Sequence, residues 1–365
     1  MGTSGLALGC LFFVVASESA QQFELKNVNQ LAEAKKFQKI VIRDLQVPAG
    51  VTLDLSNLKP GTTVEFAGRI TFGYKEWKGP LVKVTGKQLT IMAHSYARFD
   101  GEGHRWWKGG RESKLVKPRF FEAIVDDSTI RGLYFKNPPA PCFLCNWCHN
   151  TAISKITVDA KDAGDGRAGV AFNTDGISLG YVKNITVRDS YVFNQDDCFV
   201  TGAGEDMLVE NLTCEGGNGI GVGSLGKGAE VRRLTIRNSK IINNLVGLDI
   251  KTELNAVGAL RDVTFENIEM KDIRQFGITI HGNEGPTYPT GEPTYFAIEN
   301  LTVRNVRGNM VGSGGANVWI WLHPNSAKNW RWENVNVQGG KSGMFRPPLQ
   351  CKGIPSNMRI PCAEK

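Results

Sequence analysis

The chain has 365 residues, 41% of them hydrophobic, so it is long enough to bury a sizeable core. Its formal net charge of +7 suits a polyanionic partner, but the Lys and Arg residues are scattered and form no basic stripe with aromatics, which argues against nucleic acid. Beyond residue 20 no stretch approaches about eighteen apolar residues, which excludes a membrane-spanning helix from the mature chain.

The first element in chain order is the apolar run Leu6 to Ala16, which ends in small residues. It is too short to span a bilayer and predicts a secretory signal peptide over residues 1–20, leaving a mature chain of 21–365. No Lys or Arg precedes the run, and a buried N-terminal strand is the alternative interpretation. Because the sequence turns polar from Gln21 onward, we favour cleavage and expect a secreted, extracellular protein.

A repeated strand motif dominates the rest of the chain. A polar residue, an aliphatic, Thr or a similar residue, and a β-branched or aromatic residue recur at roughly 20–40 residues, which is typical of solenoids. Further short apolar runs lie between the copies, and no long amphipathic helical pattern does, so we predict one parallel β-helix rather than two domains or a leucine-rich horseshoe. A β-sandwich is the structural alternative. The clearest copies begin at Lys155, Asn184, Asn211, Arg233, Asp262 and Asn300.

The two open ends of a solenoid need covers that prevent edge pairing. Leu31 to Lys39 is compatible with a short capping helix at the N-terminal end, and the loop from Cys351 to Cys362 could close the other end. Asn184, Asn211 and Asn300 lie in Asn-x-Thr sequons, which are glycosylation acceptors in an exported chain. The same Asn and Thr are also ordinary members of the repeat, so both interpretations stay open.

The cysteines fit an oxidising compartment. Cys142, Cys145 and Cys148, followed by His149, have spacing that resembles a metal site. A structural zinc site usually draws on a second ligand pair, and none stands out, so one disulfide with a spare thiol is favoured over zinc.

Three polar segments interrupt the repeat: Asn173 to Gly176, Asn194 to Cys198, and Gly216 to Gly226. The adjacent Asp196 and Asp197 are costly within a strand unless they have partners or one is protonated. Asp175 lies about one coil earlier, so stacked coils bring all three carboxylates to one patch.

Crowded carboxylates raise at least one pKa, so that one acid stays protonated while another stays ionised. Glycoside hydrolysis requires this division of labour, and the inverting mode separates the two groups by about 6.5–9.5 Å. A calcium site is the alternative, but the segments lack EF-hand spacing. We therefore predict a hydrolytic site with no metal and no cofactor.

These blocks resemble the polygalacturonases, the pectin-degrading glycoside hydrolases of family twenty-eight, especially the fungal and insect endo-acting members. The resemblance covers most of the mature chain, including the segments from Asp100 to Trp107 and from Lys117 to Phe121, and implies a right-handed parallel β-helix. It implies that Asp196 is the general acid, that Asp175 and Asp197 activate water, and that Cys198 pairs with Cys214. The predicted substrate-binding residues are Asn173, Gln195, Asn218 and Lys251. Apart from the resemblance, Cys351 and Cys362 bracket a Pro-rich tail and are predicted to form a disulfide.

The chain departs from the family pattern around these blocks. The His of Gly-His-Gly is Asn218, the Arg of Arg-Ile-Lys is Asp249 while Lys251 is kept, the active-site Tyr is Glu284, and the second Asp of Asn-Thr-Asp-x-x-Asp is Ser178. An Arg binds a sugar carboxylate in a planar fork, whereas Asp249 is expected to repel it. No other His replaces the missing one, and His281 is expected in a turn or on the surface.

Two functions follow. The first is hydrolysis of α-1,4-galacturonosyl linkages in plant cell-wall pectin by a secreted monomer, with a preference altered toward neutral, esterified or branched galacturonan. The second is a catalytically impaired relative that binds pectin or a plant inhibitor protein. A purely structural or adhesive solenoid would require the three aspartates to be accidental.

Overall fold

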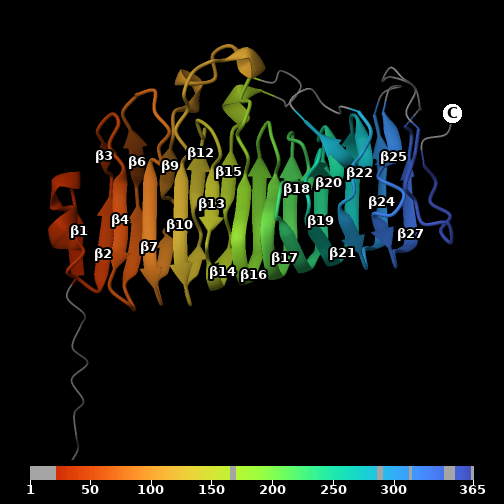
Figure 1. Cartoon of the computed structure of the whole chain (residues 1–365). Helices are drawn as coiled ribbons and strands as arrows, with labels where there is room; N and C mark the ends of the chain where they lie inside the picture. The colour runs from red at the N-terminus through yellow and green to blue at the C-terminus, as the bar shows by residue number, and fades with distance from the viewer. Residues whose placement is uncertain (1–21, 165–169, 286–290, 312–314, 341–349, 363–365) are drawn as a thin grey trace, which may run out of the picture.

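The alternation of buried aliphatic and exposed polar residues produces a parallel β-helix in the computed structural model, which describes residues 22–164, 170–285, 291–311, 315–340 and 350–362. Strands from successive coils pair in parallel along the whole described stack (Figure 1). One coil takes 22 residues between Asp189 and Asn211 and 38 between Asp262 and Asn300. The predicted fold and repeat length are therefore confirmed.

The first part of the stack consists of short strands, whereas from β16 onward several strands bend through a corner and continue along the next side of the coil. In the N-terminal half they are β1 Gln22–Leu25, β2 Lys39–Arg43, β3 Gln46–Val47, β4 Leu53–Leu58, β5 Thr63–Ala67, β6 Arg69–Phe72, β7 Val82–Lys87, β8 Thr90–Ala93, β9 Arg98–Asp100, β10 Phe121–Asp126, β11 Thr129–Arg131, β12 Tyr134–Lys136, β13 Phe143–Asn146, β14 His149–Ser154 and β15 Thr157–Asp159.

The second part contains the long strands that carry the polar segments at their ends. They are β16 Ile177–Phe193, β17 Phe199–Glu215, β18 Ile220–Leu225, β19 Glu230–Ile242, β20 Val246–Glu253, β21 Ala259–Ile273, β22 Phe276–Glu284, β23 Ala297–Glu299, β24 Thr302–Met310, β25 Ala316–Trp321, β26 Ala327–Lys328 and β27 Arg331–Gln338.

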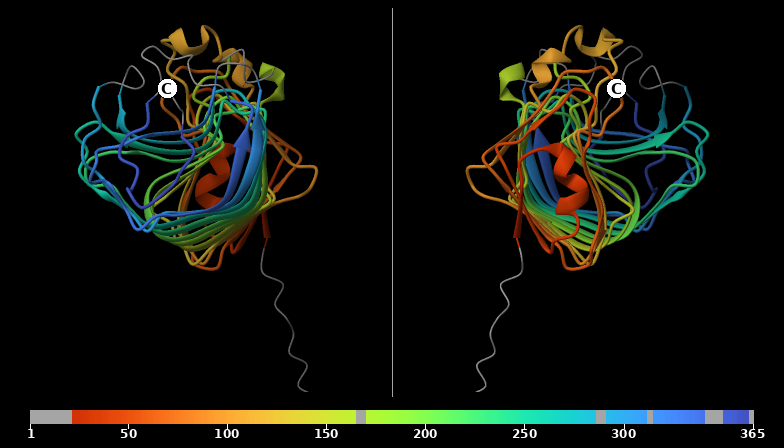
Figure 2. Two further views of the ribbon diagram at one scale, coloured as in Figure 1. Left: turned by 90° about the vertical axis from the view of Figure 1, so that its right-hand side faces the viewer. Right: turned by 90° about the vertical axis from the view of Figure 1, so that its left-hand side faces the viewer.

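Helical segments are few and short among the described residues. The N-terminal helix α1, Leu31–Ala34, follows the 3-10 turn η1, Val28–Gln30, and Figure 2 shows it lying across the open end of the first coils. It is shorter than the predicted stretch to Lys39, since it ends at Ala34 and a turn over residues 35–38 leads into β2. Further 3-10 turns are η2 Gly103–Arg105, η3 Gly110–Glu112 and η4 Lys161–Ala163, which project from one edge of the stack in Figure 1. No helix among the described residues has the length and apolar character needed to cross a bilayer.

The core is a column of inward-facing residues. The aliphatic position of each motif copy is at most 1% exposed, as at Ile185, Leu212 and Val263, so each coil buries its inner side against its neighbours. Buried side chains of this kind contribute about 1.5–3 kcal/mol each. The regular burial explains why the repeat tolerates loops of different length on the outside.

The Asn residues of the repeat form ladders on the outside of the corners. Asn184, Asn211 and Asn300 have φ between 53° and 58°, a left-handed conformation that Asn tolerates better than most residues. Each donates its side-chain amide to the preceding coil, to Asn150, Asp189 and Asp262 respectively. These sequon residues thus have a structural role in the repeat, and glycosylation at them stays a prediction.

The cysteines pair as the sequence indicated. Cys145 and Cys148 form one disulfide and leave Cys142 as a buried thiol, while Cys198 pairs with Cys214 and Cys351 with Cys362. The C-terminal disulfide loop also joins the last coils, since Lys352 donates its backbone N–H to Ile320 and accepts from Leu322. It therefore covers backbone at the C-terminal end, as predicted. The proposed signal peptide lies outside the described residues.

Candidate active site

The three predicted carboxylates meet at the beginning of two stacked strands. Asp175 precedes β16 and Asp196 and Asp197 precede β17, and the register Ile177 to Phe199 aligns the two segments. One carboxylate oxygen from each residue lies within 4.8 Å of the others. The convergence expected from coil stacking is therefore present.

The spacing of these oxygens follows from the fold. Neighbouring parallel coils are about 4.8 Å apart, so side chains that extend in the same direction from equivalent positions lie close to one another. The nearest oxygens are consequently closer than the gap of about 6.5–9.5 Å that was expected for a typical inverting pair.

The crowding perturbs the acidity of the cluster. Burial, followed by repulsion from Asp196 and Asp197, raises the pKa of Asp175 well above its ordinary value. Burial and then the charge of Asp197 raise the pKa of Asp196 to about 6. Because burial and mutual repulsion raise the pKa values of Asp175 and Asp196, at mildly acidic pH the cluster holds a proton that a lone exposed Asp would have lost.

Asp196 is fixed by three hydrogen bonds. Its carboxylate accepts from the side-chain amide of Asn218 at 3.0 Å, from the backbone N–H of Asn173 at 3.0 Å and from that of Asp197 at 2.9 Å. Asn173 has φ of 62°, and this turn directs its N–H at the acid. Asn173 and Asn218 thus lie in the site, where they orient Asp196.

Gln195 lies beside the cluster but faces away from it into the protein. It is 6% exposed, accepts from the backbone of Ala171 at 2.7 Å and donates to the carbonyl of Ala163 at 3.0 Å. In this structure it fixes the loop that precedes Asp175. A direct contact between Gln195 and substrate stays a prediction.

Lys251 places an ammonium group beside the carboxylates. Its Nζ lies 3.1 Å from Asp197 Oδ2 and 3.6 Å from Asp249 Oδ2, and both carboxylates are buried. Burial opposes the charged form of Lys251, but attraction from Asp197 and then Asp249 prevails and raises its pKa. The lysine that was expected to bind a substrate carboxylate is therefore already paired with two protein carboxylates.

The burial of Asp249 changes the charge that its carboxyl group carries. It is 5% exposed, and its Oδ1 has no hydrogen-bond partner among the described residues. Burial raises its pKa to about 7, against the attraction of Lys251. Asp249 is therefore neutral in mildly acidic solution and repels an anionic ligand only as it ionises.

The expectation for His281 was wrong. The residue lies in β22, its side chain is fully buried, its ring stacks on Trp319 at 5.6 Å, and its Nε2 is 3.5 Å from Glu284 Oε2. Burial and then the nearby charge of Lys251 lower the pKa of His281 to about 3, so it is neutral. Alternation through Ile278 and Ile280 places His281 on the opposite face of the strand, and this face is buried as well, so the sequence pattern alone gave no signal for its burial.

Two further polar residues support the site and were not singled out from the sequence. Asn194 donates to the carbonyls of Thr174 and Asp197 at 2.8 and 2.9 Å, and so joins the two coils that carry the acids. Lys117 donates to the carbonyl of Phe172 at 2.8 Å, and burial lowers its pKa while Asp196 opposes this effect. Both residues lie in segments that carry the family resemblance. Their residue types alone did not predict that Asn194 joins the two coils or that Lys117 bonds to Phe172.

In the described part of the chain, the oxygens of Asp175, Asp196 and Asp197 are close enough together to hold a metal ion. The ammonium of Lys251, 3.1 Å from Asp197, already supplies a positive charge there. We assign no ion to them, and a mechanism without metal or cofactor stays a prediction.

Comparison with known proteins gives one family. The model of the glycosyl hydrolases family 28 matches residues 37–360. Endopolygalacturonase 1 of Colletotrichum lindemuthianum is 40% identical over 329 residues, covering 88% of this chain and 87% of that protein. A polygalacturonase of Cochliobolus carbonum is 39% identical over 322 residues, covering 87% and 86%.

Solved structures share the fold at lower identity. The endopolygalacturonase I of Stereum purpureum complexed with two galacturonate has a TM-score of 0.67 at 23% identity and covers 87% of this chain and 98% of that chain. The endo-xylogalacturonan hydrolase of Aspergillus tubingensis has a TM-score of 0.75 at 18% identity and covers 94% and 99%.

Proposed function

Since the chain belongs to the glycosyl hydrolases of family 28, we propose that it hydrolyses α-1,4-galacturonosyl linkages in plant cell-wall pectin. The observation that carries the proposal is the state of the three carboxylates. Asp197 is paired with the ammonium of Lys251 and can serve as the base. Asp175 and Asp196 have raised pKa values, so the cluster also holds a proton that Asp196 can donate.

In the proposed reaction Asp196 gives its proton to the glycosidic oxygen as the C1–O bond breaks. A water molecule, oriented by Asp175, attacks C1 and passes a proton to Asp197, the carboxylate paired with Lys251. Asp197 then releases that proton to solvent and Asp196 takes one up, which regenerates the site. We propose inversion at C1. Because the oxygens are closer than in a typical inverting pair, proton NMR of the first-formed anomer is the measurement that decides this point.

The test of the activity is release of reducing sugar from polygalacturonate and from highly methyl-esterified pectin between pH 4.5 and 8. The Asp196→Asn variant, checked for folding, is the matched control. Release by the wild type that the variant lacks supports the proposal. No release from either substrate at any pH by the folded wild type refutes it.

The second candidate is a catalytically impaired protein that binds pectin or a plant inhibitor protein. The observation that favours it is that Lys251 is already held by Asp197 and Asp249 and cannot freely meet a sugar carboxylate. The double variant Asn218→His with Asp249→Arg discriminates the two. If only the double variant releases sugar, the substitutions cause the loss of activity.

Secretion as a monomer is part of the same proposal. Residues 1–20 would be removed, and 21–365 would form one β-helix unit outside the cell. The three disulfides support an oxidising compartment. Mass spectrometry of the protein from culture medium tests the cleavage site, and light scattering tests the oligomeric state.

A further inference from the structure

Two large aromatic side chains are stacked on the outside of adjacent coils. Trp147, which follows β13, and Tyr181, in β16, lie with ring centroids 4.5 Å apart and planes 7° from parallel. They are 55% and 59% exposed. Because the two rings touch, they form one contiguous apolar patch, and covering such a patch with a ligand is favourable.

Tyr181 lies at the first corner of β16, the strand that begins just after Asp175. Tyr181 is six residues beyond Asp175 on the same coil, and an extended chain rises about 3.3 Å per residue, so the two Cα atoms are separated by up to about 20 Å. The register shifts on both sides of Gly180 where β16 pairs with β17, so Tyr181 lies outside the regular ladder. The ring is therefore separate from the site described above.

A shallow, open hollow of about 370 Å³ is lined by Tyr181 but not by Trp147. This volume is in the range of about 300–1,000 Å³ that small-ligand pockets occupy. Its floor on the following coils is made of small residues, Ala203, Gly204 and Gly228. A Cβ added at Gly228 would meet no atom within 4 Å. Trp147 thus stacks on the Tyr181 ring, and the Tyr181 side chain, 59% exposed, also lines the hollow.

The charged groups at the rim of the hollow are paired with each other. Lys183 Nζ lies 2.8 Å from Glu205, and Arg232 forms an ion pair with Glu230. Such paired groups still offer hydrogen bonds to hydroxyls, but their charges are compensated. The rim therefore suits a polar, uncharged ligand better than a carboxylate.

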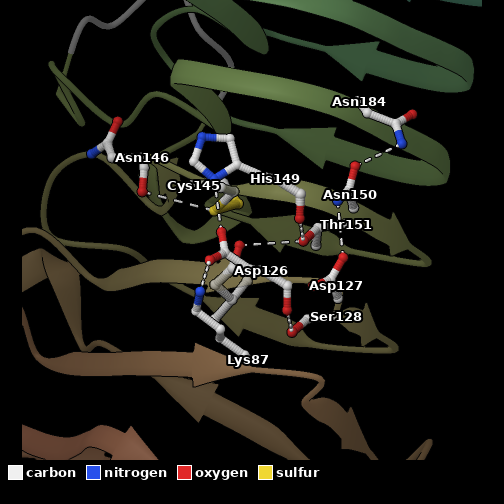
Figure 3. A network of polar contacts seen from close by, with 12 residues as sticks. Lys87, Asp126, Asp127, Ser128, Cys145, Asn146, His149, Asn150, Thr151 and Asn184 are labelled. Carbon is white, nitrogen blue, oxygen red and sulfur yellow. Dashed lines mark hydrogen bonds and ion pairs between the residues drawn. A yellow bond between two sulfur atoms is a disulfide. The ribbon is translucent and has the colours of Figure 1, made fainter. Parts of the chain in front are cut away.

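His149 completes the rim with a fixed orientation. Figure 3 shows its Nδ1 facing Asp126 Oδ1, at 2.7 Å, with the other ring nitrogen turned away from that carboxylate. Asp126 is held in turn by Lys87 at 3.3 Å. A pre-oriented imidazole loses little conformational freedom when it bonds a ligand.

We propose that the exposed side chain of Tyr181 binds an uncharged pyranose ring of a pectic chain, such as a methyl-esterified galacturonosyl unit, at a site remote from the three aspartates. The C–H face of a sugar carries partial positive charge and packs on the negative face of an aromatic ring. The hydroxyls then meet the polar rim. The substrate class rests on the proposed function, whereas the stacking site rests on the geometry of Trp147 and Tyr181.

The test is affinity electrophoresis of the full chain in gels that contain highly methyl-esterified pectin or polygalacturonate. All variants carry Asp196→Asn so that hydrolysis does not interfere. Tyr181→Ala is expected to weaken retention by esterified pectin about tenfold, and Tyr181→Phe, which keeps the ring face, to preserve it. Tyr96→Ala is the matched control, because Tyr96 is 54% exposed and stacks on His94 on a different coil.

Equal retention of the Tyr181→Ala and Tyr96→Ala proteins overturns the inference. If Tyr181→Ala weakens retention only in gels that contain polygalacturonate, the inference that the ligand is uncharged is wrong. Loss of retention in Tyr181→Phe as well as Tyr181→Ala also overturns the stacking site. These outcomes are independent of the proposed hydrolysis, which fails only if the wild type releases no sugar.

Discussion

Asp249 gives the sharpest test of the electrostatics of the site. The folded protein raises its pKa from 3.8 to about 7, chiefly through burial, so it binds a proton more tightly than the unfolded chain does. Its contribution to stability is complete below pH 3.8 and is lost progressively as pH rises to about 7. Asp249→Asn removes this titration while keeping the shape of the side chain.

The magnitude follows from the two pKa values. Each pH unit between them changes the free energy of unfolding by about 1.36 kcal/mol, so between pH 4.5 and 8 the wild type loses about 3 kcal/mol that the variant retains. For a chain of this size that is a change in Tm of roughly 5 °C. We therefore expect Asp249→Asn to gain about 5 °C relative to the wild type when both are moved from pH 4.5 to 8.

The assay is a thermal scan by circular dichroism at both pH values and one scan rate. Asp206→Asn is the control, because Asp206 is exposed and its hydrogen bond with Arg233 lowers its pKa. Its titration lies below pH 3.8, so that variant should track the wild type between pH 4.5 and 8. If the difference in Tm between Asp249→Asn and the wild type is the same at both pH values, Asp249 does not titrate as inferred.

Three other predictions concern the same region. Asp196→Asn is expected to lower kcat, measured by reducing-sugar release, by about 10²–10⁴ and to remove the fall in rate above pH about 6. If the variant keeps that fall in rate, another group causes it. Lys251→Met leaves two buried carboxylates without their cation and should cost about 3–5 kcal/mol at pH 8 but less at pH 5, where protonation relieves the charge; equal losses of Tm at both pH values would contradict this. Replacing Cys198 and Cys214 together by Ser should cost about 2–5 kcal/mol, measured by denaturant unfolding, and an unchanged midpoint would show that the bond is not needed.

The fold and the convergence of the acids were predictable because they depend on a repeat. Once the coils stack, residues at equivalent positions such as Asp175 and Asp197 must lie side by side, whatever their side chains do. The length of the capping helix was not predictable from its composition, since a turn over residues 35–38 follows it and leads into β2, which pairs with β1. Pairing with a neighbouring strand overrides helix propensity.

Side-chain partners were less predictable than positions. The sequence predicted that Lys251 lies in the site. Whether its ammonium group faces the substrate or the protein depends on which carboxylates are buried around it. His281 was misplaced for a related reason: His alone is more often exposed, whereas here it continues a strand that is buried along most of its length. The sequons showed the same limit, because the ladder bond of Asn184 to Asn150 involves a pairing between coils that no local pattern contains.

The charges of Asp196 and Asp249 together make the site dependent on acidity in two separable ways. Lowering the pH through about 6 loads the proton donor Asp196, and it also keeps Asp249, with a pKa of about 7, uncharged. An ionised Asp249 repels a galacturonate carboxylate but not its methyl ester. We therefore expect kcat to fall above pH about 6 on both substrates, while KM rises above pH about 7 for polygalacturonate alone. Steady-state kinetics from pH 4.5 to 8 separates the two effects, with Asp249→Asn as the variant in which the rise in KM disappears. A rise in KM shared by both substrates would mean that the repulsion from Asp249 is not its cause.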